Sequence, residues 1–253
     1  MTLRRIQRSL TLIELTIVLL VLAAVAGIIV PRLSGYGERA HGATTASSMQ
    51  ETAKALALFE ANKGRMPNNW DNLIDVVGGA GTGLPASLTD TGVTPALTPG
   101  TLASAAEAQV LTDAGITTVY NFDSSAGTFD ATFLPYAGGA TPTPTTVANN
   151  MPIAVVPNSV FGFSGSEKVV ALGIGRLNEM VNEVITDAPV VFEGELQPAA
   201  AYLRLFVAFQ ILDASGNPLA KARPLGVFKV EPADGSIAGA GTHLQVYYES
   251  RNQ

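Results

Sequence analysis

Few residues in this chain of 253 are of types suited to catalysis or metal binding. It has no cysteine, which excludes disulfides, thiolate metal sites and cysteine nucleophiles. The two histidines, His41 and His243, lie far apart in the chain, so neither a histidine metal site nor a Ser-His-Asp triad is favoured. The acidic and glycine-rich patterns therefore have to be considered one by one.

Three short patterns could carry chemistry, and each has a plainer interpretation. The glycines of Gly173–Arg176 suggest a phosphate loop, but the spacing and the Lys-Ser/Thr of a P-loop are missing. The alternating polar residues of Asp213–Asn217 are similar to part of a calcium loop, yet no Glu closes it, which favours an Asx-type turn. Glu193 and Glu195 are typical of solvated loop charges. The sequence thus predicts no enzyme, no metal and no cofactor.

Glu14 is the acidic residue with the most unusual surroundings. It is the only charged residue between Leu10 and Val30, a run that as a helix would be about 30 Å long, enough to cross a bilayer core. A carboxylate inside such a run costs on the order of 2.5–3.5 kcal/mol unless its charge is compensated. Three arginines precede the run, namely Arg4, Arg5 and Arg8. Because positive charge is enriched on the cytoplasmic side of a membrane span, these arginines predict a cytoplasmic N-terminus.

An ordinary secretory signal is the alternative interpretation of this segment. It has a basic start, an apolar centre and a possible cleavage site at Ala24-Val25-Ala26. However, a signal peptide gains nothing from Glu14, and the apolar run continues past that site through Gly27–Val30. Under this alternative the chain would be a secreted or membrane-anchored binding domain, or an enzyme, cut near Ala26.

The stretch "RSLTLIELTIVLLVLAAVAGIIVP" resembles the N-terminus of type IV prepilins and type II secretion pseudopilins. That family has a short basic leader, then Gly, then Phe-Thr-Leu-Ile-Glu, then an apolar helix containing a proline. Here Thr11–Leu15 matches the motif, while Ser9 replaces the Gly and Leu10 the Phe. Cleavage between Ser9 and Leu10 would place Glu14 and Pro31 at the family's positions. The resemblance covers about the first thirty residues, and the helix to Asn62 loosely.

Several residue roles follow from this resemblance. It implies that a prepilin peptidase removes residues 1–9 and that the new N-terminus, Leu10, is N-methylated. Glu14 would pair with the Leu10 amine of an adjoining subunit and set the register of a filament. Pro31 would kink or locally unwind the helix. The implied partners are like or related filament subunits, the peptidase and an inner-membrane assembly platform.

The apolar run is expected to continue into one long helix. Residues 10–31 would form its transmembrane or filament-core half, and residues 32–63 a second half that packs on a head domain, residues 64–253. One face is predicted to turn inward, formed by Met49, Ala53, Leu56 and Ala57. Lys63-Gly64 is a good helix stop.

In the head, the spacing of Trp70, Leu73, Ile74 and Val77 predicts a short helix capped by Asn68 or Asn69. A second helix is expected within residues 101–115, and residues 138–150 are interpreted as a low-complexity loop. Residues 213–218 predict a hairpin turn. Strand candidates are "ITTVYNF", "TFDATFLPY", "MPIAVVP", "KVVALGIG", "AYLRLFVAFQIL", "RPLGVFKV" and "HLQVYYES".

The expected fold is therefore α+β and pilin-like: a long N-terminal helix, transmembrane in its first half, packed on a β-rich globular domain. The expected function is that of a structural subunit in a pseudopilus or type IV pilus-like filament. The expected location is the inner membrane, as a single-pass protein with its head on the periplasmic or extracellular side, and then the filament. A net charge of −6 gives no support to a nucleic-acid partner.

Overall fold

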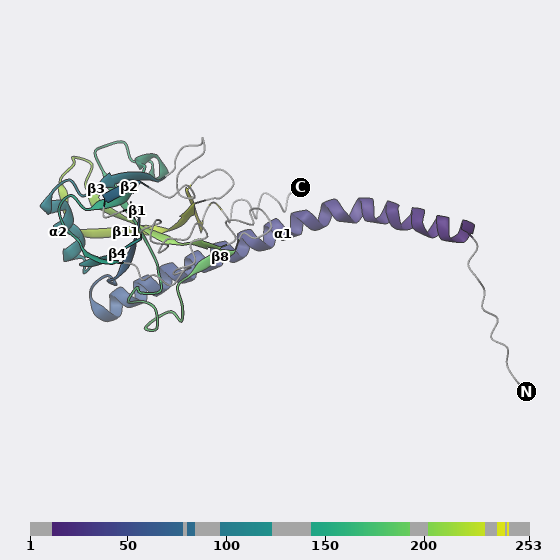
Figure 1. Ribbon diagram of the computed structural model, residues 1–253, viewed down its shortest axis with the longest axis horizontal. Helices are drawn as coiled ribbons and strands as arrows, with labels where there is room; N and C mark the ends of the chain where they lie inside the picture. Colours follow the sequence, from purple (N-terminus) through teal and green to yellow (C-terminus); the bar gives the residue numbers. More distant parts are fainter. Residues whose placement is uncertain are drawn as a thin grey trace, which may run out of the picture.

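One long helix projects from a β-rich head (Figure 1). The computed structural model describes residues 12–77, 80–83, 97–122, 143–192, 202–230, 237–240 and 242. Helix α1 (Leu12–Lys63) has 52 residues and is thus about 78 Å long. Its second half lies along the head, while its first half extends away from it. Strand candidates 128–136 and 243–250, with Glu193, Glu195 and His243, lie outside the described residues.

The second half of α1 is amphipathic. It buries Met49, Leu56 and Phe59 against the head, each no more than 5% exposed. Ala53 and Ala57, which the sequence places on the same inward face, are instead exposed. The helix ends at Lys63, where the sequence predicts a stop. Gly64 has a φ of 72°, and its amide donates to the Glu60 carbonyl, a left-handed cap that glycine adopts without strain.

The transmembrane half expected for this helix is contradicted. Among the residues that the structure describes, no helix is long and apolar enough to span a membrane. The expected single-pass placement in the inner membrane, with a head on its far side, is corrected by the same finding.

The head is built on a curled mixed sheet of ten strands, with the order β12-β11-β10-β7-β1-β4-β5. Off this path, β2 pairs with β1, and β6 lies between β3 and β7. The bounds are β1 Trp70–Val77, β2 Ala80–Gly83, β3 Thr98–Thr101, β4 Thr118–Phe122, β5 Thr143–Thr146, β6 Pro152–Val156, β7 Lys168–Gly173, β10 Phe206–Leu212, β11 Pro218–Val230 and β12 Ile237–Gly239. A separate pair joins β8 (Val190–Phe192) to β9 (Tyr202–Arg204). The helical elements of the head are α2 (Ala105–Asp113) and the short 3-10 helix η2 (Asn158–Phe161).

The expected pilin-like fold is wrong in the head as well as in the helix. The central strand β1 pairs in parallel with β4, so the sheet is mixed. A parallel pair needs a crossover connection, and α2 lies in the chain between these two strands. The helix predicted within residues 101–115 is confirmed as α2, with Ser104 as its N-cap and Gly115 (φ 101°) just past its end.

The helix predicted at residues 70–77 is wrong, because this segment is strand β1. Its pairing register shifts between Asp71 and Asp75, and such irregularities break the alternation of inward and outward side chains. Trp70 packs in the core on one face of the sheet, while the adjacent residues Leu73 and Ile74 both pack on the other. As a result, the apolar residues of this strand are spaced in the sequence as they would be on one face of a helix.

The sheet has a core on each face. The larger core lies beneath α1 and α2 and contains Trp70, whose indole meets the Phe209 ring edge-on at 5.2 Å between centroids. The smaller core, on the other face, contains Phe206 and receives Phe161 from η2. Between these faces the buried Asn72 side chain joins three strands, since its Nδ2 donates to Asn121 Oδ1 on β4 (2.8 Å) and to the Pro152 carbonyl on β6 (2.9 Å).

Two edge strands are rich in threonine and proline. The stretch interpreted as a low-complexity loop contains β5, which pairs with β4 and places Pro144 opposite Tyr120. Strand β3 pairs with β6 and carries Pro99. Proline lacks the amide that another strand would need, so it is tolerated at edges and discourages further pairing.

Candidate functional site

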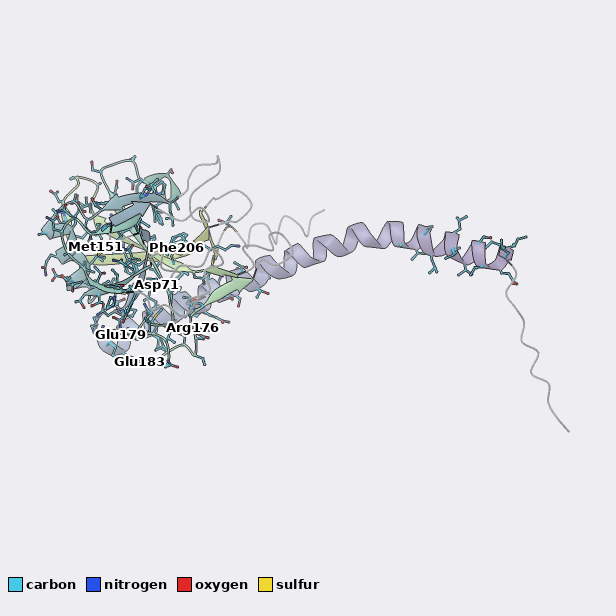
Figure 2. All side chains as sticks on the ribbon, viewed as in Figure 1. Asp71, Met151, Arg176, Glu179, Glu183 and Phe206 are labelled. Carbon is cyan, nitrogen blue, oxygen red and sulfur yellow. The ribbon has the colours of Figure 1, made fainter. Side chains whose placement is uncertain are left out.

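The first part of α1 exposes an apolar surface on all its sides. We call Leu12–Ala26 the apolar segment, and every residue in it is exposed. Exposed fractions of its large side chains range from 46% at Val25 to 78% at Leu12. Those side chains are Leu12, Ile13, Leu15, Ile17, Val18, Leu19, Leu20, Val21, Leu22 and Val25. Figure 2 shows this end of the helix standing clear of the head, with its side chains directed outward.

Exposure on this scale is energetically unfavourable. Burying one large aliphatic side chain contributes about 1.5–3 kcal/mol, and monomeric proteins rarely expose long contiguous apolar surfaces. A helix that is apolar all round is normally buried on all sides. The apolar segment is therefore the strongest candidate for an interaction site in the described chain.

Glu14 lies in the first turn of α1 and is exposed. An acid in that position is favoured by the partial positive charge of the helix N-terminus. Two residues along, the Thr16 hydroxyl donates to the Ile13 carbonyl at 2.8 Å. The proposed cleavage residues, Ser9 and Leu10, lie outside the described residues, so their relation to Glu14 stays a prediction.

Pro31 lies inside α1, and the helix continues through it without a break. Figure 1 shows α1 gently curved rather than interrupted. The local unwinding that the family resemblance implies is thus not seen in α1. A proline in a helix interior removes one backbone hydrogen bond, so curvature is the milder of the two outcomes expected there.

Ion pairs fasten the other end of α1 to the head. The Arg65 guanidinium binds both Glu179 carboxylate oxygens, at 2.6 and 3.2 Å. The Asn68 amide donates to the same carboxylate at 2.9 Å. Lys63 pairs with Glu183 at 3.0 Å. We call these contacts the clasp; Figure 2 labels its two glutamates, beside the end of α1.

The clasp perturbs the ionisation of its members. Burial raises the pKa of Glu179, but the hydrogen bonds from Arg65 and from the Asn68 amide outweigh it and hold that pKa below the ordinary value. The hydrogen bond to Glu179 correspondingly raises the pKa of Arg65. Sequence reasoning missed this clasp, because its charged partners are separated by more than a hundred residues and no local pattern connects them.

Two of the three polar patterns that might carry chemistry lie in the described residues, and both make structural contacts there. The Asp213 carboxylate accepts hydrogen bonds from the Ser215 and Asn217 amides, both at 2.9 Å, as in an Asx-type turn. These bonds, led by the one from Asn217, lower the pKa of Asp213. Gly175 packs against the buried carboxylate of Asp71, and a Cβ at that position would overlap it. The glycine thus lets the backbone at residue 175 pack closely against the Asp71 side chain.

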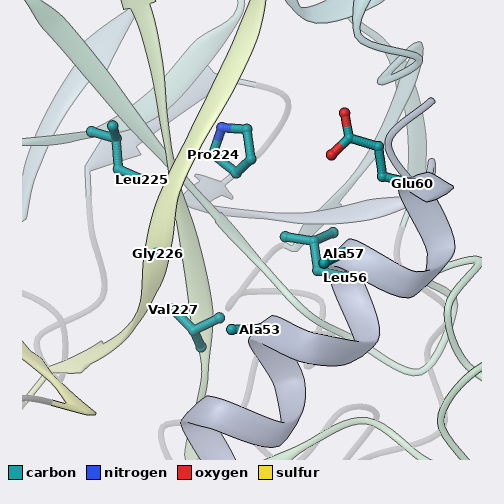
Figure 3. A pocket seen from close by; sticks show the side chains of 8 residues that line it. All are labelled: Ala53, Leu56, Ala57, Glu60, Pro224, Leu225, Gly226 and Val227. Carbon is teal, nitrogen blue, oxygen red and sulfur yellow. The ribbon is translucent and has the colours of Figure 1, made fainter. Parts of the chain in front are cut away.

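No group of metal-binding side chains is present in the described ranges. Specifically, no three His, Cys, Asp or Glu residues lie close enough there to hold an ion. One shallow groove lies between α1 and β11, and Ala53, Ala57 and Gly226 are among its lining residues (Figure 3). Seven of its eight lining residues are of apolar type, which fits a packing contact better than a polar substrate.

Comparison with known proteins identified no relative. No family model, no curated protein and no solved structure matches this chain.

Proposed function

We propose that this chain is a structural, non-enzymatic subunit of a filament, of the type II secretion pseudopilus or type IV pilus-like kind. It is cut between Ser9 and Leu10 by a prepilin peptidase and assembles through the apolar segment. Its partners are further copies or related subunits, and an assembly platform that adds them to the filament. The observation that carries this proposal is a long helix whose apolar segment, Leu12–Ala26, is exposed on every side.

Two further features support assembly through α1. Strands β3 and β5 are blunted by Pro99 and Pro144, which discourages association of heads through these edges. The clasp joins the end of α1 to the head and helps to hold the two in one arrangement. A filament subunit needs a head that does not aggregate by itself and a defined arrangement of that head on the helix through which it assembles.

The test combines the mature N-terminus with electron microscopy. The full chain is produced with and without a prepilin peptidase, and the product is sequenced from its N-terminus and examined for filaments. We expect a product that begins at Leu10, carries an N-methyl group and forms filaments only when the peptidase is present. A product that begins at Gly27 and stays monomeric would overturn the proposal in favour of an exported binding domain or enzyme.

A further inference from the structure

A groove of about 200 Å³ runs between the second half of α1 and strand β11. Its helix wall is low because Ala53 and Ala57 stand where larger side chains would fill the space, and its strand wall is formed by residues 224–227 of β11. The β10–β11 register shifts between the pairs Ala208–Gly226 and Phe209–Pro224, so β11 bulges here. Figure 3 shows Pro224 and Val227 directed toward α1 across this gap.

The chemistry of the groove is that of a packing site. Of its eight lining residues, the one charged side chain is Glu60, at the rim, and its carboxylate is 3.4 Å from the ammonium of Lys221. An engineered apolar cavity of about 150 Å³ accepts a benzene molecule. The groove therefore has room for one or two aliphatic side chains, and not for a whole helix.

The same chain has aliphatic side chains that are exposed to solvent and could fill such a groove. The apolar segment exposes ten large hydrophobic residues. The segment cannot reach the groove of its own chain, because both lie on the one continuous helix α1, about 50 Å apart along its axis. Only a second copy can bring the two surfaces together.

We propose that the groove is the receiving half of the contact between copies, and that it takes aliphatic side chains from the apolar segment of a neighbouring chain. This inference rests on the proposed assembly through α1. The contact joins two different surfaces, so it leaves a free groove at one end and a free apolar segment at the other. Such a head-to-tail contact, displaced by about 50 Å along the helix, repeats without closing and generates a filament.

The first experiment fills the groove. Ala57→Phe places a ring in the space, whereas Ala43→Phe adds the same ring to an exposed alanine of α1 that does not line the groove. Both full-length variants should unfold at a temperature close to that of the original chain. We expect Ala57→Phe to raise the concentration needed for filament formation at least tenfold, and Ala43→Phe to leave it within twofold. Equal assembly by the two variants, with both heads folded, would overturn the inference.

The second experiment uses the absence of cysteine, which lets introduced thiols report single contacts. Ala57→Cys is combined in turn with Leu15→Cys, Leu19→Cys and Leu22→Cys, and filaments are oxidised and separated by size without reductant. A ladder of covalent oligomers is expected from at least one of these pairs. Leu58→Cys is the matched control, because Leu58 is exposed on α1 and does not line the groove.

The outcomes separate this inference from the proposed function. Filaments that form normally yet give no ladder with Ala57→Cys, or an equal ladder with Leu58→Cys, would show that copies meet elsewhere on α1. Failure of the original chain to form filaments with the peptidase present would instead overturn the proposed function itself.

Discussion

At the residue scale, Glu14 is the one charge within the apolar segment. The family resemblance implies that it pairs with the amine of Leu10 in a neighbouring copy. Removing one member of a buried ion pair typically costs about 3–5 kcal/mol, because the other charge stays uncompensated. We therefore expect Glu14→Ala to reduce the pelleted filament fraction at least tenfold. Glu51→Ala, at an exposed acid farther along α1, should have no effect, and unchanged assembly by Glu14→Ala would exclude the register role.

The clasp residue Glu179 makes stability depend on pH. Its pKa in the folded chain is below the ordinary 4.5, so the carboxylate binds its proton less readily than in the unfolded chain. Its stabilising contribution is complete above pH 4.5 and is lost as the pH falls through the lowered folded-state pKa.

Glu179→Gln should therefore lower the free energy of unfolding near pH 7 by about 0.5–1 kcal/mol, a value reduced by solvent screening of this half-exposed pair. The difference between variant and original chain should shrink in urea titrations well below pH 4.5. Glu183→Gln, whose pair with Lys63 is more exposed, should cost less. A deficit for Glu179→Gln that is equally large at low pH would contradict the electrostatic account.

At the element scale, α2 is held at its N-terminus by its N-cap, by a hydrogen bond to the residue before that cap and by an ion pair. The Ser104 hydroxyl accepts from the Glu107 amide (3.2 Å), and the Glu107 carboxylate accepts from the Ala103 amide (3.0 Å). That carboxylate also binds the Lys168 ammonium of β7 at 2.5 Å, with side chains only 8% and 19% exposed. One acid thus satisfies the helix end and docks the helix on the sheet.

Glu107→Leu should cost about 3–5 kcal/mol in unfolding free energy, because it leaves the Lys168 ammonium without its anion in a mostly buried site. Ser104→Ala should cost only about 1 kcal/mol, the usual value of an N-cap. Adding Lys168→Met to Glu107→Leu should recover part of the loss, since two apolar groups then pack together. Chemical denaturation of the original chain, Glu107→Leu, Lys168→Met and the double variant gives the coupling energy of this pair, and strictly additive costs would disprove the pairing.

At the scale of the whole molecule, the head and α1 share a core. The larger core of the sheet contains three side chains of α1: Met49, Leu56 and Phe59. Burial of each contributes about 1.5–3 kcal/mol to the free energy of unfolding. Removing all three would therefore take away much of a typical stability of about 5–15 kcal/mol. We expect a fragment of residues 43–253 to be a stable monomer, because it keeps these side chains and lacks the apolar segment. A fragment of residues 64–253 should still unfold cooperatively, at a clearly lower temperature.

Calorimetry and sedimentation of the two fragments check this expectation. Oligomers of fragment 43–253 would indicate that the head contributes its own assembly surface. A fragment 64–253 without a cooperative transition would show that α1 is an indispensable part of the head fold rather than a lid upon it.

Local signals in the sequence determined several elements. The glycine after Lys63 ends α1, Ser104 and Gly115 bracket α2, and the turn at residues 213–218 joins β10 to β11. Each of these depends on the conformational preferences of a few adjacent residues. The apolar segment and Glu14, which form the candidate site, were likewise evident from composition alone. The membrane span expected there was not borne out, because no helix within the described ranges is long and apolar enough to cross a bilayer.

Only the tertiary structure decided the rest. The segment Trp70–Val77 has helical spacing, but pairing with β4 and β7 on its two sides supplies hydrogen bonds and burial that outweigh local preference. The threonine and proline of β5 look like a loop until β4 provides the neighbouring strand. The clasp and the groove each join residues more than a hundred positions apart. Contacts of that range depend on how the whole chain folds, and no local pattern in one sequence records them.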